Sequence, residues 1–278
     1  MGYSIRPARI SDVESVTPWT TDTFSWGDYI PTRMPIWLDD PSSAVFVSVT
    51  EDDVPAALVH VTMLSPTECW IEGARVHPDH RRRGLGSSLN DAGVAWARGR
   101  GARVIRLAVE EDNHAARTQV EGLGYRLVST WVYASFDVAP THRTSDQFRL
   151  RPAPGSDAEA AWLFWAASDL ARDGRELIAL GWQWRTARPE DVTAVGELLQ
   201  SPAGWVIIQQ PAEDWISTRW FATTPEGLLA LLDGLLDLAA ERSVSDLDVK
   251  LPSLGWTTEA LTRFGGQASE TLVYSKPV

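Results

Sequence analysis

The sequence contains very little cysteine and very little lysine. Cys69 is the single cysteine among 278 residues, which excludes an internal disulfide and makes a cysteine-based zinc site untenable. It lies at the start of a strand-like run and is interpreted as a small core residue. Of the 25 basic residues, only Lys250 and Lys276 are lysines. We take this bias as a sign of the source's habitat and not of the chemistry.

Long apolar runs are also missing. No segment approaches the ~18 consecutive apolar residues of a membrane span, and the first twenty residues lack the layout of a signal peptide. We therefore expect a cytoplasmic protein that does not bind membranes. A content of 44% hydrophobic and 22% charged residues suits one large domain or two ordinary ones.

Positive charge is in deficit, because the formal net charge is −12. Nucleic-acid binding draws on clustered Lys and Arg, so we expect no nucleic-acid partner, and small cationic molecules fit better. Among the five histidines only His77 and His80 lie close together, and they fall in a predicted turn. We therefore expect no metal.

The pattern of apolar residues predicts a mixed sheet with helices on both faces. Strands are expected at 3–7, 44–50, 56–64, 70–76 and 104–109, and helices from residue 11, over 29–39 and over 84–98. The order is β-α-α-β-β-β-α-β-α-β, which makes the fold class α+β (mixed α/β).

The segment His77–Ser87 joins the strand at 70–76 to the helix at 84–98 and is a candidate anion-binding loop. Glycines at 84 and 86 let a ligand approach the backbone, while Arg81, Arg82 and Arg83 add positive charge. The free N–H groups and the dipole of a helix's first turn favour phosphate. The alternative is a basic surface turn that caps an ordinary helix.

The pattern Arg81-x-x-Gly84-x-Gly86 resembles the pyrophosphate loop of the GNAT superfamily of acyl-CoA-dependent N-acyltransferases. Asn113-His-Ala-Ala116 and Leu123-Gly124-Tyr125 follow in the family's order, so the resemblance covers about residues 3 to 136. It implies a GNAT-like sheet flanked by helices, with acetyl-CoA as co-substrate. It also implies the residues that contact acetyl-CoA: Val76, His77, Arg81, Arg82, Arg83, Gly84, Leu85, Gly86, Ser87 and Asn113. For Asn113 the alternative is an N-cap of the helix that begins at His114.

Acetyl transfer to an amine requires a base, because an alkylamine has a pKa near ~10 and is protonated at neutral pH. The family often places a glutamate on the fourth strand, where this chain has Glu72. The Val76 amide would stabilise the tetrahedral oxyanion by about 3 kcal/mol. If no bulge intervenes, Glu72 and Val76 lie on the same face of the strand. The alternative is that Glu72 is an exposed strand residue.

The proton donor is less well defined. The family often has a tyrosine seven residues after the asparagine, where this chain has Val120. A thiol pKa near ~8.5 lets the thiolate leave without a dedicated acid. Tyr29, Ser87 or a water molecule could substitute.

Two strings, Asp28-Tyr-Ile-Pro31 with Trp37-Leu38 and Trp70-Ile-Glu-Gly-Ala-Arg-Val76, resemble histidine N-acetyltransferase-like members. In that interpretation Tyr29 and Glu72 border the acceptor site. Arg75 either holds a substrate carboxylate or braces the strand.

A polar linker at 138–146 divides the chain into domains at residues 1–139 and 146–278. Arg185-Thr-Ala-Arg-Pro-Glu-Asp191 echoes Ile5-Arg-Pro-Ala-Arg-Ile-Ser-Asp12, so the second half is interpreted as a degenerate copy of the first. The cofactor loop is missing from it, since Glu226 stands where an anion would bind. Such a copy would be structural, a homodimer surface or a wall of the substrate pocket. An unrelated α+β domain is the alternative.

The sequence therefore predicts an N-acetyltransferase that moves an acetyl group from acetyl-CoA to the amine of a small molecule or amino acid by direct transfer. One alternative is an acetyl-CoA-binding sensor without turnover, which the valine at position 120 and the degenerate half suggest. The other is acetylation of protein N-termini or lysines.

Overall fold

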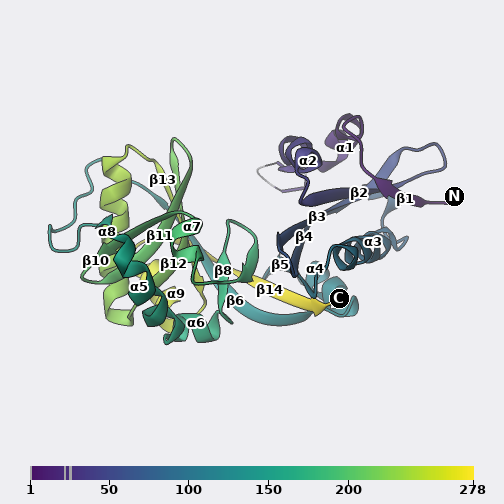
Figure 1. Ribbon diagram of the computed structural model, residues 1–278. Coiled ribbons are helices and arrows are strands. Elements are labelled where there is room, and N and C mark those ends of the chain that lie inside the picture. The colour runs from purple at the N-terminus through teal and green to yellow at the C-terminus, as the bar shows by residue number, and fades with distance from the viewer. Residues whose placement is uncertain (1, 22, 25–26) are drawn as a thin grey trace. The chain divides into compact units, whose positions relative to one another are not determined.

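The chain forms two compact units in a computed structural model that describes residues 2–21, 23–24 and 27–278 (Figure 1). One unit comprises Met1–Leu107, Glu121–Tyr125 and Ser275–Val278, and the other comprises Ala108–Val120 and Arg126–Tyr274. Each unit thus includes residues from both sides of the segment 138–146, and the domain boundary placed there stays a prediction.

The first part of the chain has the predicted order of elements. They are β1 (Ser4–Pro7), α1 (Asp12–Thr20), α2 (Ile30–Asp39), β2 (Ser43–Val49), β3 (Pro55–Ser65), β4 (Glu68–Val76), the 3-10 helix η1 (Pro78–His80), α3 (Leu85–Gly99), β5 (Val104–Glu110), α4 (His114–Gly122) and β6 (Arg126–Asp137). The sequence β-α-α-β-β-β-α-β-α-β is therefore confirmed.

In the first unit the sheet runs β1-β2-β3-β4-β5. The neighbours are antiparallel except for β4 and β5, which are parallel. Helices α1 and α2 cover one face of this sheet and α3 covers the other (Figure 1). Helix α3 packs closely because a Cβ on Gly93 would lie 2.8 Å from Cγ1 of Val61. Larger residues at position 93 would push the helix away from the strands.

The second part of the chain contains elements that the apolar pattern did not predict, together with those it did. They are β7 (Arg151–Pro152), the 3-10 helix η2 (Gly155–Asp157), α5 (Ala158–Ala166), α6 (Asp169–Asp173), β8 (Leu177–Ala179), β9 (Trp184–Thr186), α7 (Asp191–Ala194), β10 (Glu197–Ser201), β11 (Gly204–Ala212), β12 (Trp215–Thr223), α8 (Pro225–Glu241), β13 (Asp246–Pro252), α9 (Gly255–Arg263) and β14 (Gln267–Pro277). The sheet of the second unit runs β14-β6-β13-β12-β11-β10-β7, and β8 pairs with β9 in a separate hairpin.

An ion pair that occurs in both halves supports the predicted internal repeat. Asp12 accepts two bonds from the Arg6 guanidinium, at 2.7 and 2.9 Å, and one from the Arg9 amide at 2.7 Å. Asp191 accepts two bonds from Arg185, at 2.7 and 2.5 Å, and one from the Arg188 amide at 2.7 Å. In each half this aspartate begins a short helix and ties it to the preceding strand.

The strand pairing repeats as well. Strands β4 and β5 pair in parallel over three residue pairs, from Glu68–Val104 to Trp70–Arg106. Strands β12 and β13 also pair in parallel over three residue pairs, from Trp215–Asp246 to Ser217–Asp248. Both units therefore contain a parallel pair of strands that separates after a short contact, which confirms the tandem interpretation of the fold.

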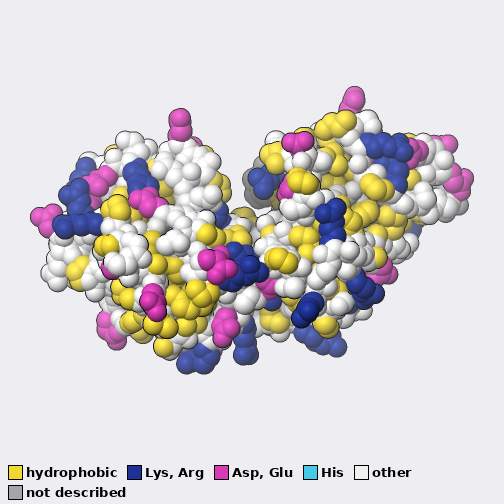
Figure 2. All heavy atoms as spheres, in the orientation of Figure 1, with side chains coloured by type: hydrophobic (Ala, Val, Ile, Leu, Met, Phe, Trp, Pro, Cys, Tyr) yellow, Lys and Arg dark blue, Asp and Glu magenta, His cyan; other side chains and the backbone are white. Residues whose placement is uncertain are grey.

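On the face shown in Figure 2, Lys and Arg side chains are interspersed with Asp and Glu side chains, as on an ordinary solvated surface. Within the described residues, no helix is long and apolar enough to cross a membrane.

Candidate active site

The loop between β4 and α3 leaves the start of α3 open. Gly84 is the residue before the helix and has the left-handed conformation, with φ +78°. A Cβ added there would meet no atom within 4 Å, and no side chain among the described residues caps the helix. The amides of Leu85, Gly86 and Ser87 form the first turn, whose N–H groups have no partner inside a helix. This arrangement suits a bound anion.

The three arginines of the loop are exposed, and two of them are tied to neighbouring groups. Arg83 donates to the Tyr3 hydroxyl at 2.9 Å and to the Asp79 carbonyl at 3.1 Å. Arg81 donates from Nε to the Val76 carbonyl at 3.4 Å. Arg82 has a positive φ of 58°. The guanidinium groups thus surround the open helix start with positive charge.

His77 and His80 stabilise this loop from within. Nδ1 of His77 accepts from the Asp79 amide at 3.2 Å, and Nδ1 of His80 lies 2.8 Å from the Tyr3 hydroxyl. The His77 ring also packs edge-on against Trp19, with centroids 5.5 Å apart. No group of three or more His, Cys, Asp or Glu side chains in the described residues could hold a metal ion.

The edge of β4 that faces β5 is unpaired near Val76. Among the described residues, the pairing of β4 with β5 ends at Trp70 and Arg106. On the other edge, the His77 amide donates to the Ala56 carbonyl of β3 at 2.9 Å. Successive amides of a strand point to opposite edges. The Val76 N–H therefore points toward the edge of β4 from which β5 has separated. The role of this amide as the oxyanion donor stays a prediction.

A β-bulge interrupts β4, so the condition under which Glu72 and Val76 would share a face is not met. Leu58 pairs with Arg75 and His60 pairs with Glu72, so one residue of β3 lies opposite two residues of β4. The extra residue shifts the alternation of side chains by one. Gly73, at the bulge, has a φ of +67°, and its Cβ position would lie 3.2 Å from the Trp37 ring. Glycine is needed there for both reasons.

The Glu72 carboxylate is paired with a buried histidine. Oε1 of Glu72 lies 3.2 Å from Nδ1 of His60, and the two residues are direct cross-strand neighbours. The His60 side chain is 1% exposed and that of Glu72 is 19% exposed. The His60 ring stacks on Trp37, with centroids 4.0 Å apart and planes 4° apart. His60 is thus fixed on two sides and orients a carboxylate that still reaches solvent.

Arg75 and Tyr29 lie beside each other. The Arg75 guanidinium lies 5.2 Å from the Tyr29 ring centre and donates from Nε to Asp28 at 2.7 Å. Burial is the largest single influence on the pKa of Asp28 and raises it. The bonds from Arg75, Thr23 and the Ile30 amide, with the Arg75 charge, nevertheless together hold this pKa below its usual range. Because Asp28 already balances the Arg75 charge, the bracing interpretation of Arg75 is favoured over a substrate-carboxylate contact.

Tyr29 could donate a proton at neutral pH. Burial of the phenol raises the pKa of Tyr29, and the nearby Glu72 carboxylate acts in the same direction against Arg75. Its ring contacts Trp37, with centroids 6.0 Å apart. Tyr29 and the Glu72–His60 pair thus both contact the same indole. Burial also raises the pKa of the Cys69 thiol to about 12, which makes it inert as a nucleophile.

Asn113 acts as a helix cap. Its Oδ1 accepts from the Ala116 amide at 3.1 Å, at the start of α4. This is the geometry of the alternative interpretation, and the contact of Asn113 with acetyl-CoA stays a prediction.

The sequence did not reveal three residues that contact the predicted site residues: His60, Asp28 and Trp37. His60 was considered only as a metal ligand, although a single histidine inside the apolar run 56–64 is a signal of a buried polar pair. Asp28 and Trp37 belong to quoted strings, but nothing in the sequence showed what they touch.

Comparisons with known proteins agree with this geometry. Residues 13–125 match the model of the Acetyltransferase (GNAT) family. A GCN5-related N-acetyltransferase from Sphaerobacter thermophilus is 17% identical, with a TM-score of 0.68, and the match covers 99% of this chain and 95% of that one. A GCN5-related N-acetyltransferase from Kribbella flavida is 14% identical, with a TM-score of 0.55 and coverage of 99% and 72%.

A tandem GNAT protein from the clavulanic acid biosynthesis pathway is 12% identical, with a TM-score of 0.60 and coverage of 99% and 98%. At these identities the likeness shows a shared fold over nearly the whole chain. A search among curated proteins found no match.

Proposed function

We propose that the chain is an acyltransferase that acetylates the amine of a small molecule or amino acid with acetyl-CoA, because residues 13–125 match the model of the Acetyltransferase (GNAT) family. Transfer is direct. The amine nitrogen attacks the thioester carbonyl, the new C–N bond forms as the C–S bond breaks, and coenzyme A leaves as a thiolate that takes up a proton.

Acetyl-CoA is bound through the backbone of the β4–α3 segment. The amides at Arg83, Gly84, Leu85, Gly86 and Ser87 hold the pyrophosphate, supported by the dipole of α3 and the neighbouring arginines. The unpaired edge of β4 receives the pantetheine arm as an added strand would be received. The Val76 amide then lies where the oxyanion develops.

The proton steps fall to the groups that contact Trp37. Glu72 accepts the amine proton directly or through a water molecule, and His60 holds its carboxylate in place. Tyr29 is protonated and half-buried, so it is the donor we favour for the departing thiolate. Ser87 or a water molecule would serve if Tyr29 does not.

One observation carries this proposal above the others. A left-handed, uncapped Gly84 opens the helix start on the same β-strand-to-helix connection that carries Val76 and Glu72. An anion site of the pyrophosphate type and a carboxylate held by a buried histidine thus follow one another along a single segment. Neither feature alone would indicate acetyl transfer.

The proposal is tested by measuring thiol release from acetyl-CoA with a panel of free amino acids, polyamines, arylamines and peptides. We expect turnover with at least one small amine. Tight acetyl-CoA binding without turnover on any amine would instead indicate a sensor, and a preference for peptides over free amines would indicate protein acetylation. A cytoplasmic location and a homodimer both stay predictions.

A further inference from the structure

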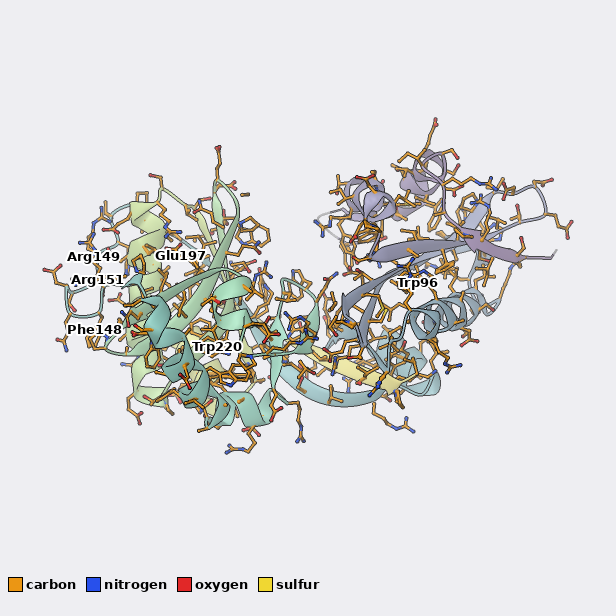
Figure 3. All side chains as sticks on the ribbon, in the orientation of Figure 1. Trp96, Phe148, Arg149, Arg151, Glu197 and Trp220 are labelled. Carbon is orange, nitrogen blue, oxygen red and sulfur yellow. The ribbon has the colours of Figure 1, made fainter. Side chains whose placement is uncertain are left out.

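The second unit contains two buried cations in the space where β12 and β13 separate. Arg219 lies on β12 and Lys250 on β13, and both line a cavity of about 10 Å³. Most of the other residues around the cavity are large and apolar; they include Trp131, Trp165, Trp220 (labelled in Figure 3) and Phe221. The assigned chemistry of the first unit uses none of them.

No ion pair involves the Arg219 guanidinium among the described residues. It sits at a bulge, because Ile207 pairs with Trp220 and Ile208 pairs with Thr218. Its Nε and Nη1 are buried and make no hydrogen bond with any described residue. Burial lowers the pKa of Arg219, and no carboxylate opposes that effect. Unpaired buried donors on a cation are rare, because the charged form loses its hydration without replacement.

Lys250 is more deeply buried, at 2% exposure, and is only partly balanced. Its Nζ lies 4.9 Å from the Tyr133 ring centre, 4.8 Å from that of Trp182 and 4.0 Å from Oδ2 of Asp248. Asp248 also accepts a bond of 2.8 Å from the Tyr133 hydroxyl. The cluster thus holds two cations and one carboxylate, which leaves one positive charge without an anion.

The hairpin of β8 and β9 covers both cations with its tip at residues 180–183. A Cβ on Gly181 would lie 3.3 Å from Nη1 of Arg219, and Trp182 lies over Lys250. The Trp182 side chain is 43% exposed. A cavity of about 10 Å³ has room for roughly one water molecule, so only a small polar group fits inside.

We propose that this cluster is a binding site for a small organic carboxylate, whose anionic group lies between Arg219 and Lys250. One missing negative charge matches a monoanion, and the cavity has room for one carboxylate oxygen but not for a bulky group. The remainder of the ligand would extend past the hairpin tip, where the exposed face of Trp182 suits a flat apolar body. The site lies wholly within the second unit and does not rest on the proposed acetyl transfer.

The two lysines of the chain make a direct test possible. The full chain is labelled with ¹³C at the lysine ε-carbons, which gives one probe at Lys250 and a control at Lys276, and is titrated with benzoate. We expect a saturable shift of the Lys250 signal alone, with no such response to benzyl alcohol, which has the same ring without the charge. Equal shifts at both lysines, or the same response to benzyl alcohol, would overturn the site.

A pH titration of the same sample sharpens the test. Burial and the nearby Arg219 lower the pKa of Lys250 to about 8, against the opposing effect of Asp248. Tyr133, the other titratable group that faces Nζ, is neutral at this pH because burial raises the pKa of its phenol. A bound carboxylate favours the ammonium form, so saturating benzoate should move the Lys250 midpoint upward. An unchanged or lowered midpoint would contradict the proposal.

Arg219→Gln should weaken benzoate binding by about tenfold or more, because it removes a charge-assisted bond. The matched control is Arg172→Gln, which makes the same charge change on the exposed surface of the same unit, where Arg172 pairs only with its neighbour Asp173. Acetyl-CoA affinity should be unchanged in both variants. Wild-type benzoate affinity in a folded Arg219→Gln protein would refute the site; if that variant does not fold, the Lys250 titration decides.

Discussion

The β4–α3 and β12–α8 connections share a fold and differ in the chemistry of one turn. Before α3, Gly84 is left-handed and the helix start is open. Before α8, Thr224 is extended and its hydroxyl accepts from the Gly227 amide at 3.2 Å. A Cβ on Gly227 would lie 2.5 Å from the Ala203 carbonyl, and Glu226 adds a negative charge. The start of α3 is open, and the start of α8 is capped by its own chain.

The strands that precede these turns differ at one matching position. Counted from the first parallel pair of each unit, the fifth residue is Glu72 on β4 and Arg219 on β12. Each lies at or directly beside a bulge. The same place in the fold therefore carries a carboxylate suited to accepting a proton in one unit and a cation suited to holding an anion in the other. A fold fixes positions, and the side chains at those positions fix the chemistry.

The largest effect is expected at Glu72. Glu72→Gln should lower turnover by about 10² to 10⁴, the usual contribution of a positioned base, and should leave acetyl-CoA affinity nearly unchanged. The loss should shrink at high pH, where more of the amine is neutral. Steady-state thiol release across pH measures it. Glu14→Gln, on the exposed surface of α1, is the control. Wild-type turnover of a folded Glu72→Gln protein at neutral pH would remove Glu72 from the mechanism.

The next effect concerns the open turn. Gly84→Val should weaken acetyl-CoA binding on the order of 10²-fold, because the side chain blocks the approach of phosphate to the amides. Valine also strains a left-handed backbone, so a control with equal strain is needed. Gly265→Val supplies it, since Gly265 has a φ of +83° and equally open surroundings in the other unit. Calorimetry on both variants separates the effect of backbone strain from the loss of acetyl-CoA binding. Equal acetyl-CoA affinities of the two variants would mean that the loop at Gly84 is wrongly assigned as the pyrophosphate site.

The next prediction concerns the number of acetyl-CoA molecules that one chain binds, where one site and two sites differ by a factor of two. Because Thr224 and Glu226 close the start of α8, we expect one acetyl-CoA per chain. Calorimetric titration gives the stoichiometry directly. A value near ~2 would show that the second unit binds the co-substrate despite its closed turn.

The smallest effect is expected at the closed turn. Thr224→Ala removes the cap of α8 and should lower the free energy of unfolding by about 1 kcal/mol. Acetyl-CoA affinity should not change, since this helix start does not bind it. Urea unfolding and calorimetry on the same sample measure both quantities. A loss of acetyl-CoA affinity would mean that the two helix starts are not as different as their geometry indicates.

Much of the fold could be predicted because its signals are local. The order of elements in the first part, the loop at Gly84 and the repeated Arg–Asp strings all follow from neighbouring residues. The β8–β9 hairpin was missed, because its strands have three residues each and show no readable alternation.

The contacts within the site could not be predicted in the same way. The pairing of His60 with Glu72 depends on strand register, and the bulge at Gly73 changes that register without leaving a periodic signal. Asp28 and Arg75 are 47 positions apart, so only the folded chain shows that their charges balance each other. The residue types of the site are thus visible in the sequence, while their partners and their sides of the sheet are not.

The surroundings of Lys250 and Lys276 bear on whether the chain could acetylate its own lysines. A thioester acetylates an amine that is neutral and accessible, and arginine stays protonated at every physiological pH. Lys250 is buried among aromatic rings, and Nζ of Lys276 donates to the Leu123 carbonyl at 2.8 Å and lies 5.7 Å from the Tyr125 ring. A basic surface built of arginine carries positive charge without nucleophiles. Neither lysine is therefore a good acceptor for the acetyl donor that we propose.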